Sequence, residues 1–143
     1  MPKRRIETLT WSLSTVKKKT AEALQKLRRL EEASANGFCQ CVSCGAEKHW
    51  KQMQGGHFVG GRTNGVLFIE DNIHPQCSRC NQWSNSSDAA TNYLLYMIDR
   101  YGRDRVEEIK RMRHVEVKFD KEELLEMRDE YNARIKVQLK RIK

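Results

Sequence analysis

The sequence predicts a mostly helical α+β protein in which a zinc-stapled ββα unit lies between N-terminal and C-terminal helices. Two matched Cys-x-x-Cys pairs, one opened by Cys41 and the other by Cys77, predict the staple because four thiolates complete a tetrahedral zinc site. Residues 45–76 leave room for a hairpin between the pairs, and apolar residues at helical spacing dominate both flanks. We therefore divide the chain into a basic helical arm (1–35), a zinc-bound core (36–87) and a C-terminal helical region (88–143).

Composition limits the size of the core and the cellular setting. The chain has 143 residues, of which 38% are hydrophobic and 32% charged, so a metal or a dimer interface would add needed stability. No run of about 18 apolar residues occurs, and the N-terminus lacks the apolar stretch of a secretory signal. We therefore expect a cytoplasmic protein, in which Cys-x-x-Cys pairs bind metal and do not form disulfides.

The formal charge of +8 is concentrated at the N-terminus, where residues 1–30 hold nine Lys/Arg and two Glu. A solvated basic face would explain this pattern, and so would an arm that binds a polyanion; we favour nucleic acid. Contacts of this kind position a duplex without reading its sequence. The expected DNA contacts are Lys17, Lys18, Lys19, Arg28, Arg62 and Arg79, with Lys48 and Lys51 as further candidates.

The first half of the chain begins with an expected flexible tail at 1–10. A helix should follow to about residue 34, capped by Thr10 or Ser12 and stopped by Asn36-Gly37. The first cysteine pair then lies in a turn at 38–45. We expect a strand over 48–59 with a bend at Gly55-Gly56, a loop over 60–65 and a returning strand over 66–69.

The second half is expected to be helical. Cys77 should begin a short helix that carries Cys80 and Asn81. The remaining expected elements are a turn at 85–88, a helix over 88–101 that buries Tyr93, Leu94, Met97 and Ile98, a helix over 103–113, an extended segment over 114–119, and a last helix capped by Asp120.

His57 is the candidate general base. Gly55-Gly56 precedes it and Gly60-Gly61 follows it, so the backbone there can approach a substrate closely. Neutral imidazole suits the removal of a proton from water, the step that phosphodiester hydrolysis needs, together with a cation to stabilise charge on the phosphoryl group. The alternative is a histidine that only packs or lies on the surface.

Four further residues between the cysteine pairs or beside them carry polar side chains suited to a site. Asn81 directly follows Cys80, and its carboxamide oxygen suits Mg²⁺ or Mn²⁺, although a helix-surface asparagine is the alternative. We expect Asn72 to tie the loop to the backbone at His57. Glu70 and His74 either bind the metal or support its ligands, or they have only a structural role. The fifth cysteine, Cys39, is not expected to bind the zinc.

These residues, in this order, resemble the HNH, or His-metal finger, nucleases and more closely the NinG (Rap) recombination proteins of lambdoid phages. The resemblance rests on Cys41-Val-Ser-Cys44-Gly45, His49-Trp50, Gly56-His57-Phe58, and the run from Phe68 through Glu70, Asn72, His74 and Gln76 to Cys77, Cys80 and Asn81. It implies a metal-dependent endonuclease that cuts branched DNA, such as Holliday junctions or D-loops, in phage recombination in the bacterial cytoplasm. Because junction resolution needs two cuts, we expect a homodimer with the terminal helices as its interface.

The resemblance also implies roles for individual residues. His57 would be the general base. We also count Asn72, His74 and Asn81 among the candidate catalytic residues, and we expect no organic cofactor. Structural zinc would be held by Cys41, Cys44, Cys77 and Cys80. Catalytic Mg²⁺ or Mn²⁺ would be held by Asn81, as in phage endonuclease VII, where an asparagine after the last zinc cysteine binds the metal.

Two departures from the pattern leave questions open. Many HNH enzymes carry a metal-binding Asp before the catalytic His, and Gly56 stands there, so the second ligand is Glu70, His74 or Asp88. Relatives often have a Gly-Asn turn where this chain has Ser84-Asn85-Ser86-Ser87. A non-catalytic zinc-containing DNA-binding accessory protein is the alternative function. A protein-interaction zinc domain would leave the basic N-terminal arm unexplained.

Overall fold

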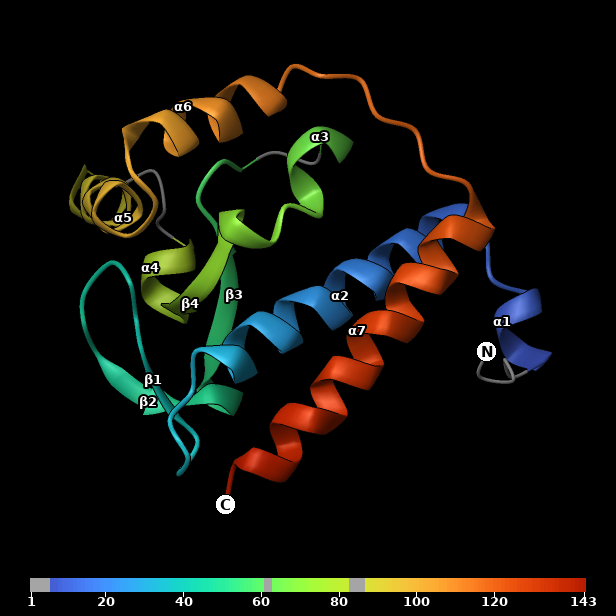
Figure 1. The fold of residues 1–143 in the computed structure, drawn as a ribbon, viewed down its shortest axis with the longest axis horizontal. Coiled ribbons are helices and arrows are strands. Elements are labelled where there is room, and N and C mark those ends of the chain that lie inside the picture. The colour runs from blue at the N-terminus through green and yellow to red at the C-terminus, as the bar shows by residue number, and fades with distance from the viewer. Residues whose placement is uncertain (1–5, 61–62, 83–86) are drawn as a thin grey trace.

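Helices make up most of the chain, and two short antiparallel sheets lie between them (Figure 1). The computed structural model describes residues 6–60, 63–82 and 87–143. The elements in chain order are α1 (Ile6–Leu9), α2 (Leu13–Glu31), β1 (Phe38–Gln40), β2 (Glu47–His49), the 3-10 turn η1 (Trp50–Gln52), β3 (Met53–His57), α3 (Asn64–Leu67), the 3-10 turn η2 (Glu70–Asn72), β4 (Ile73–Cys77), α4 (Ser78–Gln82), α5 (Ser87–Tyr101), α6 (Arg103–Met112) and α7 (Lys121–Arg141).

The two longest helices, α2 and α7, pack against each other and run in the same direction (Figure 1). Near their starts, the hydroxyl of Thr20 donates to the carbonyl of Leu124 at 3.1 Å. Near their ends, Arg141 donates to the carbonyl of Leu30 at 2.9 Å. Both helices have side-chain N-caps, with Ser12 accepting from the Thr15 amide and Asp120 from the Glu123 amide, so two of the expected caps are present.

The apolar face of α2 lies inside the main core. The core combines residues of α2, both sheets and α7: Leu24, Leu27, Leu30, Trp50, Met53, Ile73, Tyr131 and Ile135. A second cluster joins α3, α5 and α6 around Val66, Tyr93, Met97, Val106 and Ile109. No helix within the described ranges is long and apolar enough to cross a membrane.

The predicted strand over 48–59 is wrong in its extent, because β2 and β3 are separate strands joined by η1. Strand β2 pairs with β1, and β3 pairs with β4 in the register Met53↔Cys77 to His57↔Ile73. Gly55 and Gly56 lie within β3 and form no bend. A Cβ on Gly55 would lie 2.7 Å from the Cβ of Gln25 on α2, so this glycine allows the helix to approach the strand closely.

The predicted returning strand over 66–69 is also wrong. This apolar run contains the end of α3, where the amides of Val66 and Leu67 both donate to the carbonyl of Thr63. Short apolar runs fit either a strand or a buried helical turn, and burial of Val66 against α6 decides for the turn here. The returning strand is β4, whose five residues are all buried.

Other differences from the sequence predictions are smaller. A turn of helix, α1, lies in the expected tail, and α2 ends at Glu31, before Gly37 with its φ of +88°. Leu94, expected inside, is 37% exposed. Helices α4, α5, α6 and α7 are present where predicted, and Met97, Val106 and Ile109 are buried. The 85–88 turn lies largely outside the described residues.

Candidate active site

Four cysteines form a cluster with the spacing of a zinc site. The sulfurs of Cys41, Cys44, Cys77 and Cys80 all lie within 4.8 Å of one another. The Cys44 and Cys77 sulfurs are 3.8 Å apart, which equals the separation of roughly 3.8 Å that tetrahedral ligands at 2.3 Å from zinc require. The β1–β2 turn supplies the first pair, and the β4–α4 junction supplies the second. The predicted ligands are therefore together.

Cys39 is not part of this cluster. It lies on β1 next to Gln40 and is buried, with 4% exposure. Burial raises the pKa of its thiol to about 11, so the residue stays a neutral apolar packing group at neutral pH.

His57 ends β3 and is oriented by a backbone carbonyl. Its Nε2 lies 3.2 Å from the carbonyl oxygen of Leu67, which can only accept, so Nε2 carries the proton and Nδ1 keeps its lone pair. Burial lowers the pKa of His57, and the hydrogen bond to Leu67 partly opposes that shift. The imidazole is therefore neutral at physiological pH, with one nitrogen able to accept a proton.

A pocket of about 370 Å³ opens beside His57. The end of β3 and the residues after it form one side, and Ala90 of α5 forms another. The remaining wall is made by Lys110, Arg113 and His114, at the end of α6 and just beyond it. None of the eight lining residues is acidic, so the pocket is positively charged. Sequence reasoning missed these three groups; the signal was the cationic run at the end of the predicted 103–113 helix.

Asn72 fixes the path of the chain immediately after His57. It is completely buried. Its Oδ1 accepts from the Val59 amide at 2.8 Å, and its Nδ2 donates to the carbonyls of Val59 at 3.0 Å and Val66 at 3.3 Å. Its own carbonyl accepts from the Phe58 amide at 2.8 Å. The residue therefore joins the exit of β3 to α3, one wall of the His57 environment.

His74 lies in a buried cluster of tyrosines, on the strand opposite Gly56. The Tyr93 hydroxyl donates to the Gly56 carbonyl at 2.7 Å, so its oxygen accepts from His74 Nδ1 at 3.1 Å. His74 Nε2 then accepts from the Tyr101 hydroxyl at 2.7 Å. Burial lowers the pKa of His74 to about 3, with further lowering by Arg28 and Arg100. Both ring nitrogens therefore hold α5 to β4, and the Tyr93 hydroxyl extends the contact to Gly56 of β3.

Asn81 lies at the other end of β3 from His57. Its Nδ2 donates to Gln54 Oε1 at 2.6 Å, which leaves its carbonyl oxygen for a ligand. Gln54 precedes His57 by three residues, a separation of roughly 10 Å along the strand. Asn81 of α4 therefore meets β3 near its start, and His57 lies at the end of the same strand.

Neither Glu70 nor Asp88 joins these groups. Arg134 donates to both carboxylate oxygens of Glu70, at 3.0 and 2.7 Å, and this contact lowers the pKa of Glu70. Glu70 therefore ties η2 to α7. Asp88 lies exposed in the first turn of α5.

The predicted DNA contacts divide into core and surface residues. Arg28 is in the core: it is 7% exposed, its Nε donates to the Glu70 and Ile73 carbonyls, and its terminal nitrogens pair with Glu31 and Glu32. Lys18 and Arg79 are exposed. Lys17 is half-buried, Lys19 lies over the Trp11 ring at 5.2 Å, and Arg62 lies outside the described residues.

A second cationic group, the Trp50 cluster, lies at the start of β3. Lys26, Arg29 and Lys51 lie 5.6–5.8 Å from the centre of the Trp50 ring. Arg29 also donates to the carbonyls of Trp50 and Met53, which fixes it at the strand start. Positive groups therefore lie at both ends of β3.

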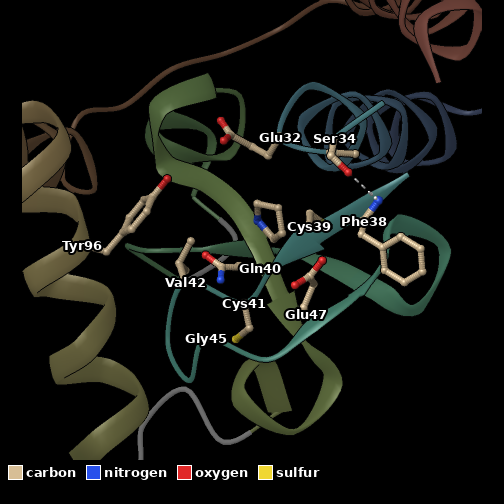
Figure 2. A pocket seen from close by; sticks show the side chains of 12 residues that line it. Glu32, Ser34, Phe38, Cys39, Gln40, Cys41, Val42, Gly45, Glu47 and Tyr96 are labelled. Carbon is tan, nitrogen blue, oxygen red and sulfur yellow. Dashed lines mark hydrogen bonds between the residues drawn. The ribbon is translucent and has the colours of Figure 1, made fainter. Parts of the chain in front are cut away.

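A larger hollow of about 600 Å³ lies elsewhere, beside β1 (Figure 2). Tyr96 of α5 and Phe38 line it at opposite sides, and Glu32 and Glu47 contribute carboxylates. Arg100 and Arg28 already pair with Glu32, at 2.7 and 3.4 Å. This hollow shares no lining residue with the pocket at His57.

Comparisons with known proteins give one family. Residues 3–141 match the family model described as "Bacteriophage Lambda NinG protein". The chain is 33% identical over 97 residues to "Protein ninG" of Escherichia phage lambda, a match that covers 67% of this chain and 46% of that relative. The chain thus matches just under half of the relative's length. No solved structure matches.

Proposed function

Because the chain belongs to the NinG family of phage proteins, we propose that it is a metal-dependent, HNH-type endonuclease that cuts branched DNA during phage recombination. The observation that carries this proposal is the state of His57: its Nε2–H donates to the Leu67 carbonyl, which leaves Nδ1 unprotonated, and the residue lines a pocket together with Lys110 and Arg113. A neutral base beside an anion-binding pocket is what phosphodiester hydrolysis needs.

In the proposed reaction, His57 Nδ1 accepts a proton from the attacking water. The water oxygen forms a bond to phosphorus while the bond to the 3′ oxygen breaks, and the 3′ oxygen takes a proton from solvent. The products are a 5′-phosphate and a 3′-hydroxyl. Lys110 and Arg113 bind non-bridging phosphate oxygens and hold the phosphate for in-line attack. Asn72 keeps His57 in position by fixing the segment that follows it.

A catalytic Mg²⁺ or Mn²⁺ would be held in part by Asn81. Its Nδ2 donates a hydrogen bond to Gln54, which leaves the side-chain carbonyl oxygen of Asn81 free to bind a ligand. A carbonyl oxygen is a hard ligand, so the residue fits the ion. When bound, the ion supplies Lewis-acid stabilisation of charge on the phosphate and the leaving oxygen. The four-cysteine cluster would hold zinc that is structural, since four thiolates leave no open position.

DNA would be positioned by the positive groups along β3. The Trp50 cluster lies at one end of the strand and the Lys110–Arg113 group at the other. A DNA backbone that runs along β3 would therefore meet cations on both sides of the reacting phosphate. Exposed Lys18 and Arg79 would extend this surface. These contacts favour DNA shape over sequence.

A homodimer would supply the two cuts that junction resolution needs. The terminal helices are the proposed interface: α7 buries Leu124, Tyr131 and Ile135 but exposes Val137 at 64% and Leu139 at 43%. Light scattering that finds only monomers, with and without junction DNA, would rule out this arrangement.

A non-catalytic DNA-binding accessory protein is the second candidate. It is favoured by the absence of any carboxylate among the residues that line the pocket at His57. This alternative uses the same cationic groups but gives His57 no chemical role.

Cleavage of a labelled four-way junction, beside a matched linear duplex, separates the two functions. Wild type, His57→Ala and the control His49→Ala would be compared at equal zinc content, in Mg²⁺ or Mn²⁺ and with EDTA. The endonuclease proposal expects metal-dependent junction cutting that His57→Ala loses while still binding DNA, and that His49→Ala keeps. Tight junction binding by wild type without cleavage in either ion would support the accessory protein.

A further inference from the structure

The position before His57 carries no side chain, and Gln76 occupies the space that a side chain would need. Gly56 lies on β3, and Gln76 is on β4 opposite Gln54. A Cβ built on Gly56 would lie 1.8 Å from Gln76 Oε1 and 2.6 Å from its Cδ. Any other residue at position 56 would therefore displace this amide. The Gln76 amide can therefore take up its position only because residue 56 is a glycine.

The orientation of the Gln76 amide is fixed by its neighbours. Ser43 donates its hydroxyl proton to the Ala89 carbonyl at 3.0 Å, so its oxygen accepts from Gln76 Nε2 at 2.9 Å. The opposite end of the amide, Oε1, must therefore be the oxygen, and it points toward Gly56. This assignment follows from the direction of the two hydrogen bonds.

Within the part of the chain that the structure describes, the Gln76 oxygen has no partner. Gln76 is 1% exposed, and its Oε1 accepts no hydrogen bond from any described residue. Buried carbonyl oxygens are seldom left without a donor or an ion, because their desolvation is then not compensated. An amide oxygen is a hard ligand of the kind that binds Mg²⁺ and Mn²⁺.

Gln76 contacts neighbours of the two residues that the proposed function uses, Asn81 and His57. Gln76 lies beside Gln54, the residue that holds Asn81, while its oxygen reaches the residue next to His57. We infer that Gln76 Oε1 is the second protein ligand of the catalytic divalent cation, together with the carbonyl oxygen of Asn81. This inference rests on the proposed function, and it replaces Glu70 and His74, whose polar atoms are bonded to Arg134 and to tyrosines.

The inferred site has an unusual charge balance. Both ligands are neutral amides, so the protein contributes no negative charge to balance the cation. Mg²⁺ sites commonly obtain part of their ligands from substrate phosphates. The ion should therefore bind weakly to the free protein and strongly only when DNA phosphates complete the site.

Binding of Mn²⁺ itself tests this inference. The loss of the free-ion signal in electron paramagnetic resonance would be followed with zinc-loaded protein alone and with an intact four-way junction, after subtraction of the DNA-only signal. All proteins would carry His57→Ala so that the DNA stays uncut. The variants are Gln76→Leu, Gln76→Glu and the control Thr20→Val, which removes another buried polar group far from the site.

We expect Gln76→Leu to weaken junction-dependent Mn²⁺ binding at least about tenfold, and Thr20→Val to leave it unchanged. Gln76→Glu should tighten Mn²⁺ binding about tenfold or more and reduce its dependence on DNA, because it adds a charged ligand. Zinc content and unfolding temperature show whether each variant is folded. Wild-type Mn²⁺ affinity in folded Gln76→Leu, or no tightening in folded Gln76→Glu, would overturn the inference.

The outcomes separate this inference from the proposed function. Junction cleavage by wild type with Mn²⁺ binding indifferent to Gln76 rejects the ligand but keeps the nuclease. Mn²⁺ binding that depends on Gln76, without cleavage of any branched substrate by the His57-containing protein, keeps the ligand and rejects the nuclease.

Discussion

The side-chain amide of Asn72 makes two hydrogen bonds to the backbone of Val59. Its Oδ1 accepts from the Val59 nitrogen at 2.8 Å, and its Nδ2 donates to the Val59 oxygen at 3.0 Å. The pair closes a ring between two segments separated by 13 residues, immediately after the histidine that we propose as the base. Because β3 has ended at His57, the backbone groups of Val59 lie outside its ladder, and the Asn72 side chain supplies their hydrogen bonds instead.

Replacing Asn72 with Ala should affect both stability and catalysis. Val59 would be left with a buried amide and carbonyl unpaired, so the free energy of unfolding should fall by about 2–4 kcal/mol. Displacement of His57 should slow junction cleavage on the order of 10²-fold while DNA binding persists. Chemical denaturation and single-turnover cleavage measure these effects. The control Asn92→Ala removes one bond, to the Ser43 carbonyl, and should leave cleavage at the wild-type rate.

Cleavage should depend on pH through His57. Only the neutral imidazole can accept a proton, so the rate should rise with pH and become constant once His57 has lost its proton. Because burial lowers the pKa of His57 below 6.5, the plateau should begin at lower pH than an exposed histidine would give. Single-turnover rates at saturating DNA and constant zinc content test this. A rate that keeps rising well above pH 6.5 would contradict the assignment.

His74 should make the protein sensitive to acid. Its folded-state pKa of about 3 lies below the ordinary value of 6.5, so the unfolded chain binds a proton that the folded chain excludes. The free energy of unfolding should therefore fall as pH drops from 6.5 toward 3, by up to roughly 5 kcal/mol from this residue. Denaturation across this range should show a shallower loss for His74→Gln. His114→Gln, at an exposed site, should follow the wild-type curve.

Loss of one cluster cysteine should release the structural metal. Cys44→Ser removes a ligand, and structural zinc contributes on the order of 10 kcal/mol to folding, so the variant should lose zinc and much of its stability. Cys39→Ala is the matched control, because Cys39 lies outside the cluster. Metal analysis and thermal unfolding should find one zinc per chain in the control. Full zinc retention by Cys44→Ser would reject the four-thiolate site.

Arg28 and Lys18 should behave as opposites although both lie on α2. Arg28→Ala removes a buried guanidinium that donates to two carbonyls and pairs with Glu31 and Glu32, which keep Arg134 and Arg100 as partners, so it should cost about 2–3 kcal/mol of stability. Lys18→Ala should change stability by less than about 0.5 kcal/mol but lower the salt dependence of DNA binding by about one unit of slope. Denaturation and binding titrations at several salt concentrations test this contrast.

The sequence predicted best the features that local patterns encode. Matched cysteine spacing located the metal cluster, and caps and helical periodicity located α5, α6 and α7. It failed where distant segments decide. Val66 is helical because α6 covers it. Gly56 lies within a strand, and its missing side chain leaves the volume that the Gln76 amide occupies. The sequence suggested that Arg28 contacts DNA, like the other basic residues of the helix. In the structure its guanidinium donates to carbonyls of η2 and β4, which lie far away in the sequence.

The candidate site followed the same division. Asn72 was expected beside His57 because of where it stands in the motif, and its hydrogen bonds run to that segment. Lys110 and Arg113 follow His57 by 53 and 56 residues in the sequence, so no local pattern connects them to it. Gln76 has no charge and follows a proline, and only the three-dimensional structure reveals its unpartnered oxygen.

The parallel pairing of α2 and α7 sets the order in which the molecule can be completed. Thr20 meets Leu124 across 104 residues of intervening chain, so this helix pair forms only after a long loop has closed. On the ribosome, α2 emerges first, and the part of its apolar face that α7 covers stays exposed until the last helix follows. Despite its helical content, the protein should therefore fold slowly, and chains terminated before α7 should depend on chaperones to stay in solution.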